Sequence, residues 1–219
     1  MSISSTDYAL LARDDSNLAG NHWEPAHMNL SRARTRGVIV LLLATLLTAT
    51  MANAATSAQA VSAGARLAKM APGSTTSCEI GKGGNINCLV DSVPTSVSEC
   101  AGEYAWGQVQ DKEGVTLQSA FDKAKAKPTA HLHERQFVCV AATSGKTQDA
   151  ERYYVIAFPT KSVPDCKGNE LCQERAQTWV GTKPAGACQW VGKEGDFTGA
   201  CAAGWVDSYA VEVFSMGLK

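Results

Sequence analysis

Two closely spaced histidines, His131 and His133, are the residues best suited to bind a metal. In a β-strand, side chains two positions apart lie on one face, so both imidazoles could hold one ion while Glu134 points away. A catalytic zinc site needs about three protein ligands, and no H-E-x-x-H motif supplies the third. Two solvated histidines at the entry of a strand are the simpler interpretation. Metal binding by this pair is therefore a lesser alternative.

A single glutamate, Glu103, has the surroundings that a general acid requires, since Tyr104 and Trp106 follow it closely. A glutamate desolvated by aromatic rings can keep its proton near neutral pH. The competing interpretation is a solvated Glu103 beside aromatic residues of the core. Glu103 is thus the candidate catalytic residue only if the protein is a small extracellular hydrolase that acts on glycan or cell wall.

Basic side chains are concentrated between residues 123 and 135. With Trp106, they form a candidate surface for an anionic glycan or an acidic partner. Such a run is more often the solvated face of a helix. The ligand-binding candidates on this surface are Trp106, Lys123 and Arg135.

A short polar loop, residues 166–172, begins and ends with cysteine. If Cys166 and Cys172 pair, the loop is rigid before it meets a partner and loses little entropy on binding. Its candidate contact residues are Lys167, Asn169 and Glu170. The alternative is a purely structural cross-link at the start of a helix.

Motifs for nucleotide, hydride or serine-nucleophile chemistry do not occur in the sequence. There is no G-x-S-x-G, no P-loop and no G-x-G-x-x-G. Lysine plus arginine (20) nearly balances aspartate plus glutamate (21), which argues against nucleic acid as a partner. We therefore expect no cofactor.

The cysteines indicate the compartment. There are eight, an even number, and none forms a C-x-x-C pair of the kind that structural zinc sites use. In an exported chain this pattern indicates disulfides, although eight cysteines allow about a hundred pairings. We expect no free thiol, and we favour pairing of neighbours: Cys78–Cys88, Cys100–Cys139, Cys166–Cys172 and Cys188–Cys201.

Residues 28–54 have the features of a cleaved signal peptide. Arginines precede an apolar core over residues 38–47, and Ala52-Asn53-Ala54 follows it. The core is about half the length that a membrane span needs, and Ala-x-Ala is a typical cleavage site. We expect cleavage before Ala55. Residues 1–27 are then a disordered or mis-assigned upstream extension, and translation begins at Met1 or Met28. No cysteine follows the cleavage site closely, which argues against a lipid anchor.

After cleavage, residues 55–77 resemble a linker with a weak helix over 58–70, and residues 78–219 form a single domain. Two segments that each contain a pair of cysteines, 78–90 and 188–201, predict hairpins, and Val-Asp-Ser occurs after the second cysteine of each pair. Apolar runs at 136–142 and 152–158 predict central antiparallel strands. The helical periodicity of 115–127 and 170–180 predicts two further helices. Alternation over 208–216 predicts a last strand.

Together these patterns predict an α+β fold: an antiparallel β-sheet with one or two helices, stapled by disulfides. The favoured function is an exported binding protein without catalysis, that is, an inhibitor, an immunity-like factor or an envelope ligand-binding protein. Its partner is a protein or glycan outside the cytoplasm, in the periplasm or beyond the cell, and no permanent membrane anchor is expected.

Overall fold

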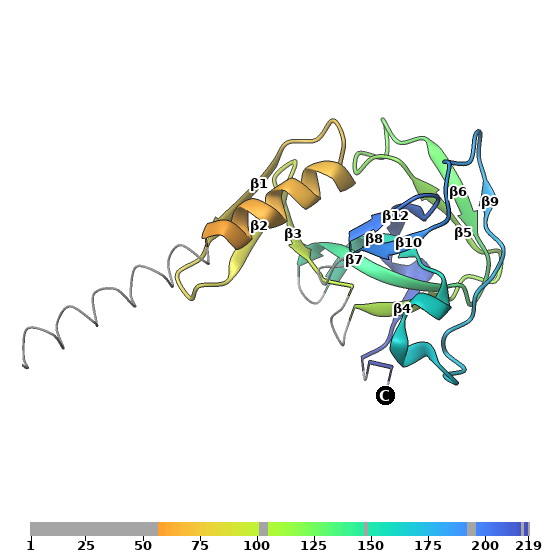
Figure 1. The fold of residues 1–219 in the computed structure, drawn as a ribbon. Coiled ribbons are helices and arrows are strands. Elements are labelled where there is room, and N and C mark those ends of the chain that lie inside the picture. The colour runs from red at the N-terminus through yellow and green to blue at the C-terminus, as the bar shows by residue number, and fades with distance from the viewer. Residues whose placement is uncertain (1–56, 101–104, 147–148, 192–195, 216, 219) are drawn as a thin grey trace, which may run out of the picture. The chain divides into compact units, whose positions relative to one another are not determined.

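The computed structural model describes residues 57–100, 105–146, 149–191, 196–215 and 217–218. The expected upstream extension and signal peptide lie outside these residues. One helix, residues 57–70, precedes a largely antiparallel β-structure, so the predicted α+β class is confirmed (Figure 1). The strands are β1 (Thr76–Ile80), β2 (Ile86–Val90), β3 (Val93–Val97), β4 (Trp106–Val109), β5 (Val115–Gln118), β6 (Pro128–Leu132), β7 (Phe137–Lys146), β8 (Asp149–Ala157), β9 (Thr178–Trp179), β10 (Gln189–Val191), β11 (Asp196–Thr198), β12 (Ala202–Asp207) and β13 (Val211–Val213).

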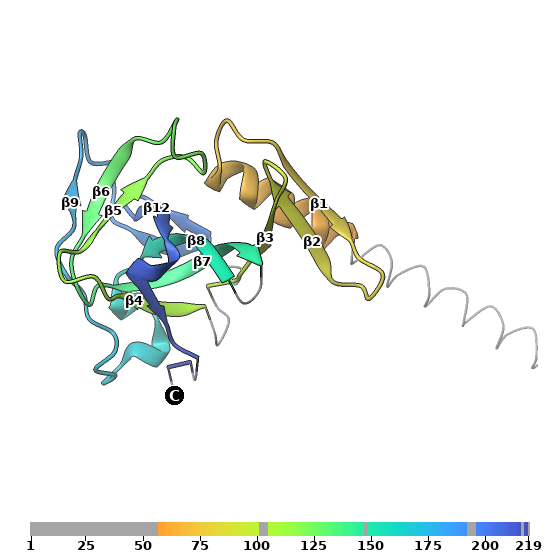
Figure 2. The same cartoon turned by 180° about the vertical axis from the view of Figure 1, so that it is seen from behind.

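The main sheet has the order β1-β2-β3-β7-β8-β12-β5-β6-β9. The long strands β7 and β8 are antiparallel neighbours, as the two apolar runs predict. β4 also pairs with β7 and with β13, which brings the C-terminal segment beside β4 (Figure 2). Gly204 allows β5 to approach β12 closely, because a Cβ there would lie 2.8 Å from the Gln118 carbonyl oxygen.

Alternating side chains of the central strands enter two hydrophobic clusters. On β7, Phe137 and Cys139 join the cluster that contains Leu67 and Met70 of the helix, whereas Val138 and Val140 join the second cluster. Both faces of the strand are buried, which explains its continuous apolar run.

The weak helix expected over 58–70 is present as the helix 57–70, so ordered structure begins before Cys78. The helix buries Leu67 completely, and its Met70 carbonyl oxygen accepts a 2.7 Å hydrogen bond from the indole Nε1 of Trp205. Thr76 then opens β1, the first strand of the hairpin. A distant tryptophan thus anchors a segment whose small, polar composition resembles a linker.

Both predicted hairpins are present. β1 pairs with β2, with Cys78 opposite Cys88, and β10 pairs with β11 in a separate sheet. Gly84 has φ +79°, the left-handed conformation that the tight turn requires. All four favoured disulfides are formed, and the described residues contain no free cysteine.

The predicted helix over 115–127 is wrong. Val115–Gln118 is the strand β5, and a series of turns follows it. Leu117 is buried in the second cluster, while Phe121 packs edge-on against Trp205 at 4.9 Å. Leu117 is buried and Phe121 partly buried, by two separate tertiary contacts rather than on one helix face.

The predicted helix over 170–180 is also wrong, and the segment runs as loop into β9. Long-range hydrogen bonds hold it. The Phe137 amide donates to the Gln173 carbonyl at 2.9 Å, and the Arg175 amide donates to Gln136 Oε1 at 2.8 Å. These bonds replace the local bonds of a helix.

The predicted strand over 208–216 is correct only in part. A 3₁₀ turn, η3 (Ser208–Ala210), comes first, and the strand β13 is limited to Val211–Val213. Tyr209 consequently lies in the turn, and 72% of it is exposed.

Candidate functional site

A pocket of about 260 Å³ opens beside the C-terminal end of β12. Strands β5, β8 and β12, the turns after β5 and the η3 turn all contribute to it. Its lining mixes two acids, two bases, an exposed tyrosine and small apolar groups: Asp111, Val115, Thr116, Gln118, Lys123, Ala126, Arg152, Val206, Asp207, Tyr209 and Ala210.

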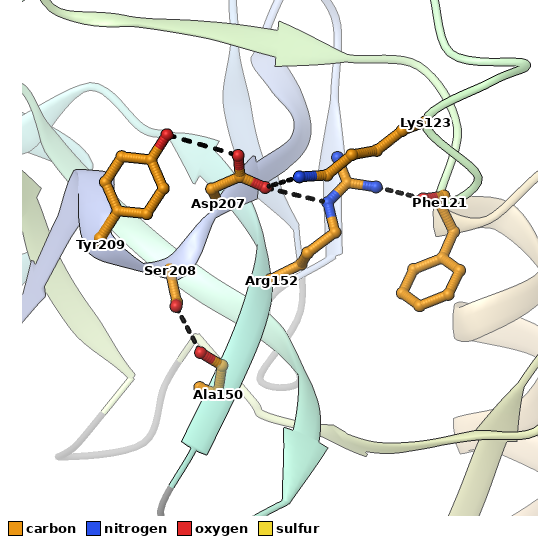
Figure 3. Close-up of polar contacts among 7 residues, drawn as sticks. All are labelled: Phe121, Lys123, Ala150, Arg152, Asp207, Ser208 and Tyr209. Atoms are coloured by element: carbon orange, nitrogen blue, oxygen red, sulfur yellow. Dashed lines mark hydrogen bonds and ion pairs between the residues drawn. The ribbon is translucent and has the colours of Figure 1, made fainter.

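The pocket is organised around the Asp207 carboxylate (Figure 3). Lys123 Nζ lies 2.6 Å from Asp207 Oδ1, and Arg152 Nε lies 3.7 Å from the same oxygen. The Tyr209 hydroxyl donates to Asp207 Oδ2 at 3.5 Å. One carboxylate thus contacts three functional groups from three separate segments of the chain.

Arg152 forms the buried side of the pocket, with only 6% of the residue exposed. Its Nη1 donates to the Phe121 carbonyl, and its guanidinium carbon lies 5.9 Å from the Phe121 ring centroid and 5.8 Å from that of Trp205. Burial lowers the pKa of Arg152, and the charge of Asp207 opposes this shift. Because the ordinary pKa of arginine is above 12, the group stays cationic at neutral pH.

The buried Arg152 Nε makes no hydrogen bond. The 3.7 Å distance from Arg152 Nε to Asp207 Oδ1 is short enough for an ion pair but too long for a hydrogen bond. Asp207 therefore compensates the charge of the guanidinium without satisfying this donor.

Lys123 and Tyr209 form the open rim. The Lys123 side chain is 65% exposed, and the turn that carries it is closed by hydrogen bonds between Ser119 and Lys127. The Tyr209 carbonyl oxygen accepts from Gln110 Nε2, which holds the backbone of η3, and its hydroxyl donates a long hydrogen bond to Asp207. Next to it, Ser208 Oγ donates to the Ala150 carbonyl and anchors η3 to β8.

Of the ligand-binding candidates from the sequence, this pocket includes only Lys123. The main residues that the sequence analysis missed are Arg152, Asp207 and Tyr209. The one available signal was the Val-Asp-Ser repeat after each predicted hairpin, which contains Asp207 but gives it no partner.

The structure corrects the assignment of Trp106 to an exposed surface. Trp106 is 3% exposed and stacks on Phe137 at 5.0 Å, so its ring is part of the core. Arg135 is exposed, in a left-handed conformation with φ +63°, but it does not line the Asp207 pocket. Glu103 lies outside the described residues.

The structure brings His131 and His133 together, with ring centroids 5.3 Å apart. His131 Nδ1 lies 3.3 Å from Thr116 Oγ1, which orients this ring. Among the described residues there is no group of three or more His, Cys, Asp or Glu side chains that could hold a metal ion. The pair could supply two ligands only.

The loop closed by Cys166 and Cys172 exposes Lys167 and Glu170, as expected of a contact surface. Asn169 differs from them. Its Nδ2 donates to the Leu218 carbonyl at 2.7 Å, and its Oδ1 accepts from the Leu171 amide at 3.0 Å. Asn169 therefore connects the loop to the C-terminal segment, a structural role.

Comparisons with known proteins do not assign a family. No family model matches the chain, and no curated protein and no solved structure matches it. In the part of the chain that the structure describes, no helix combines the length and apolar character needed to cross a membrane.

Proposed function

We propose that this protein is an exported binding protein without catalysis, and that the Asp207 pocket is its ligand site. Four disulfides are consistent with an oxidising compartment outside the cytoplasm. Among the functions expected from the sequence, we favour an envelope ligand-binding protein. Inhibition or immunity through the loop 166–172 is the competing mode.

The observation that carries the proposal is the fixed arrangement of charged and aromatic groups around one pocket. Asp207 holds Lys123 and Tyr209 at the rim and lies beside the buried Arg152. Pockets that bind small ligands combine apolar lining with a few oriented polar groups. Groups that are already oriented lose little entropy when a ligand arrives.

A capture experiment with three forms of the exported protein tests this function. Tyr209→Ala alters the pocket rim, the double change Lys167→Ala with Glu170→Ala alters the loop 166–172, and the wild type is the reference. All these side chains are exposed, so the variants should retain the wild-type melting temperature. Each form is immobilised and exposed to polysaccharide and protein fractions of cell envelope.

The proposal expects retained material to fall with Tyr209→Ala and to be unchanged in the loop variant. If the loop variant retains less material and Tyr209→Ala retains as much as the wild type, the binding surface is the loop 166–172. Release of shortened products from glycan or cell wall would instead favour the hydrolase alternative, with Glu103 as its general acid.

A further inference from the structure

We infer that the Asp207 pocket takes an uncharged, polyhydroxylated ring, that is, a neutral sugar residue of a glycan, with one face of the sugar stacked on Tyr209. This inference rests on the proposed function and specifies its ligand class. It follows from the exposed ring, the polar lining and the charge balance of the pocket.

Tyr209 provides a flat, exposed surface at the pocket rim. It is 72% exposed, and no other described Phe, Trp or Tyr side chain is exposed. Its carbonyl oxygen accepts from Gln110 Nε2, which holds the η3 backbone, and its hydroxyl lies 3.5 Å from Asp207 Oδ2. An aromatic face carries partial negative charge and attracts the weakly positive C–H groups of a sugar ring. Because Gln110 holds the backbone that carries Tyr209, the ring stays at the pocket rim with or without its hydroxyl contact.

The lining supplies both hydrogen-bond acceptors and hydrogen-bond donors. Asp207 and Asp111 present carboxylates, and Asp111 is oriented by the Glu113 amide, which donates to its Oδ1 at 2.9 Å. Lys123 donates, while Gln118 and Thr116 can both donate and accept. Sugar hydroxyls also donate and accept, so each can be satisfied by this mixture.

The charges in the pocket do not favour ionic ligands. The lining contains two cations, Lys123 and Arg152, and two anions, Asp111 and Asp207. The two charges of each sign cancel, so the lining offers neither an anion nor a cation a net electrostatic attraction. A neutral polyol needs no such attraction and can bind through hydrogen bonds alone.

The size of the pocket fits one ring of a chain rather than a long segment. Its volume of about 260 Å³ lies just below the range of about 300–1,000 Å³ that is usual for ligand pockets. Glycan recognition here would therefore be weak per site.

Calorimetric titration of the exported protein with oligosaccharides that differ in charge tests the inference. The neutral probes are the trimers of N-acetylglucosamine, maltose-type glucan and cellulose-type glucan. The charged probes are the deacetylated glucosamine trimer, which is cationic, and a hyaluronan tetrasaccharide, which is anionic. The proteins are the wild type, Tyr209→Ala, Tyr209→Phe and Lys123→Ala.

We expect at least one neutral trimer to bind more tightly than both charged probes. Tyr209→Ala should weaken it by about tenfold or more, whereas Tyr209→Phe keeps the ring and should stay within about threefold. Lys123→Ala removes one donor and should cost a neutral probe only a few-fold in affinity.

The inference is overturned if no neutral trimer binds with a Kd below about 5 mM, or if Tyr209→Ala binds as well as the wild type. A charged probe that binds best and depends on Lys123 or Tyr209 also overturns it, but leaves the proposed binding function intact. The pocket itself fails as the binding site if Tyr209→Ala retains envelope material as the wild type does.

Discussion

Arg152 of β8 and Asp207 of β12 stand directly opposite each other in the antiparallel register, with Nε 3.7 Å from Oδ1. Opposite charges at facing positions of neighbouring strands stabilise a sheet. This pair also joins the core to the pocket, since the guanidinium lies over Trp205 while the carboxylate reaches Lys123 and Tyr209.

Removing the carboxylate should cost much more stability than removing the exposed lysine. Asp207→Ala leaves the buried Arg152 without its counter-charge, and we expect a loss of about 2–3 kcal/mol in the free energy of unfolding. Lys123→Ala removes an ion pair at a solvated rim and should cost less than about 1 kcal/mol. Denaturant unfolding measures both, and equal losses would contradict the role assigned to Arg152.

The helix over 57–70 should contribute to the stability of the fold. Leu67 is completely buried, so Leu67→Ala should lower the free energy of unfolding by about 2–5 kcal/mol. Val61→Ala, in the same helix but 74% exposed, is the matched control and should change it by less than about 0.5 kcal/mol. If Leu67→Ala behaves like Val61→Ala in denaturant unfolding, the segment is a linker after all.

The four disulfides should differ in how much each contributes to the free energy of unfolding. Cys100–Cys139 closes a separation of 39 residues and both sulfurs are buried, whereas Cys166–Cys172 closes only 6. Loop-closure entropy predicts losses of about 4 and about 2 kcal/mol when each pair is replaced by alanine. Thermal unfolding of the two double variants compares them. Non-reducing peptide mapping checks the pairings, and thiol labelling of the unreduced protein should find no free thiol.

Stability should decline at high pH because of one tyrosine. Burial raises the pKa of Tyr154 to about 12, above the ordinary value near 10. The folded state therefore holds this proton more tightly than the unfolded state does. The associated stability, about 2–3 kcal/mol, is complete below pH 10 and is lost as the pH rises toward about 12.

Absorbance titration of the phenolate and denaturant unfolding test this prediction in the wild type and in Tyr154→Phe. The variant should lack the last phenolate step and lose less stability between pH 9 and about 11.5. A wild-type protein in which every tyrosine ionises near pH 10 would exclude the shift.

The exported chain should begin at Ala55. This prediction rests on the short apolar core and on Ala52-Asn53-Ala54. Intact mass of the secreted protein measures it. A mature chain that retains residues 38–47 would identify an uncleaved anchor.

Local patterns in the sequence were sufficient for several elements. The turn residues between Cys78 and Cys88 predicted the first hairpin, and the apolar runs predicted β7 and β8. The four cysteine pairs could be favoured because each joins sequence neighbours. These features depend on contacts within a short stretch or on continuous burial, which the order of residues records directly.

Periodicity was misleading where burial came from distant partners. Leu117 and Phe121 fit a helical face, but each packs against a different tertiary partner. The segment after Cys172 fits a helix as well, yet Gln136 and Phe137 provide hydrogen bonds that replace the helical ones. Apolar spacing reports that residues are buried, and it does not report which element buries them.

The sequence alone predicted the class of fold, the first hairpin and the central strands from local spacing, and it favoured the cysteine pairs without determining them. Only the tertiary structure brought Arg152, Asp207 and Lys123 to one pocket and fixed Tyr209 at its rim. These residues lie together because β8 and β12 pair in this register and because β5 approaches β12 closely at Gly204. Register is set by the packing of whole strands against the core, so no short stretch of the chain encodes it.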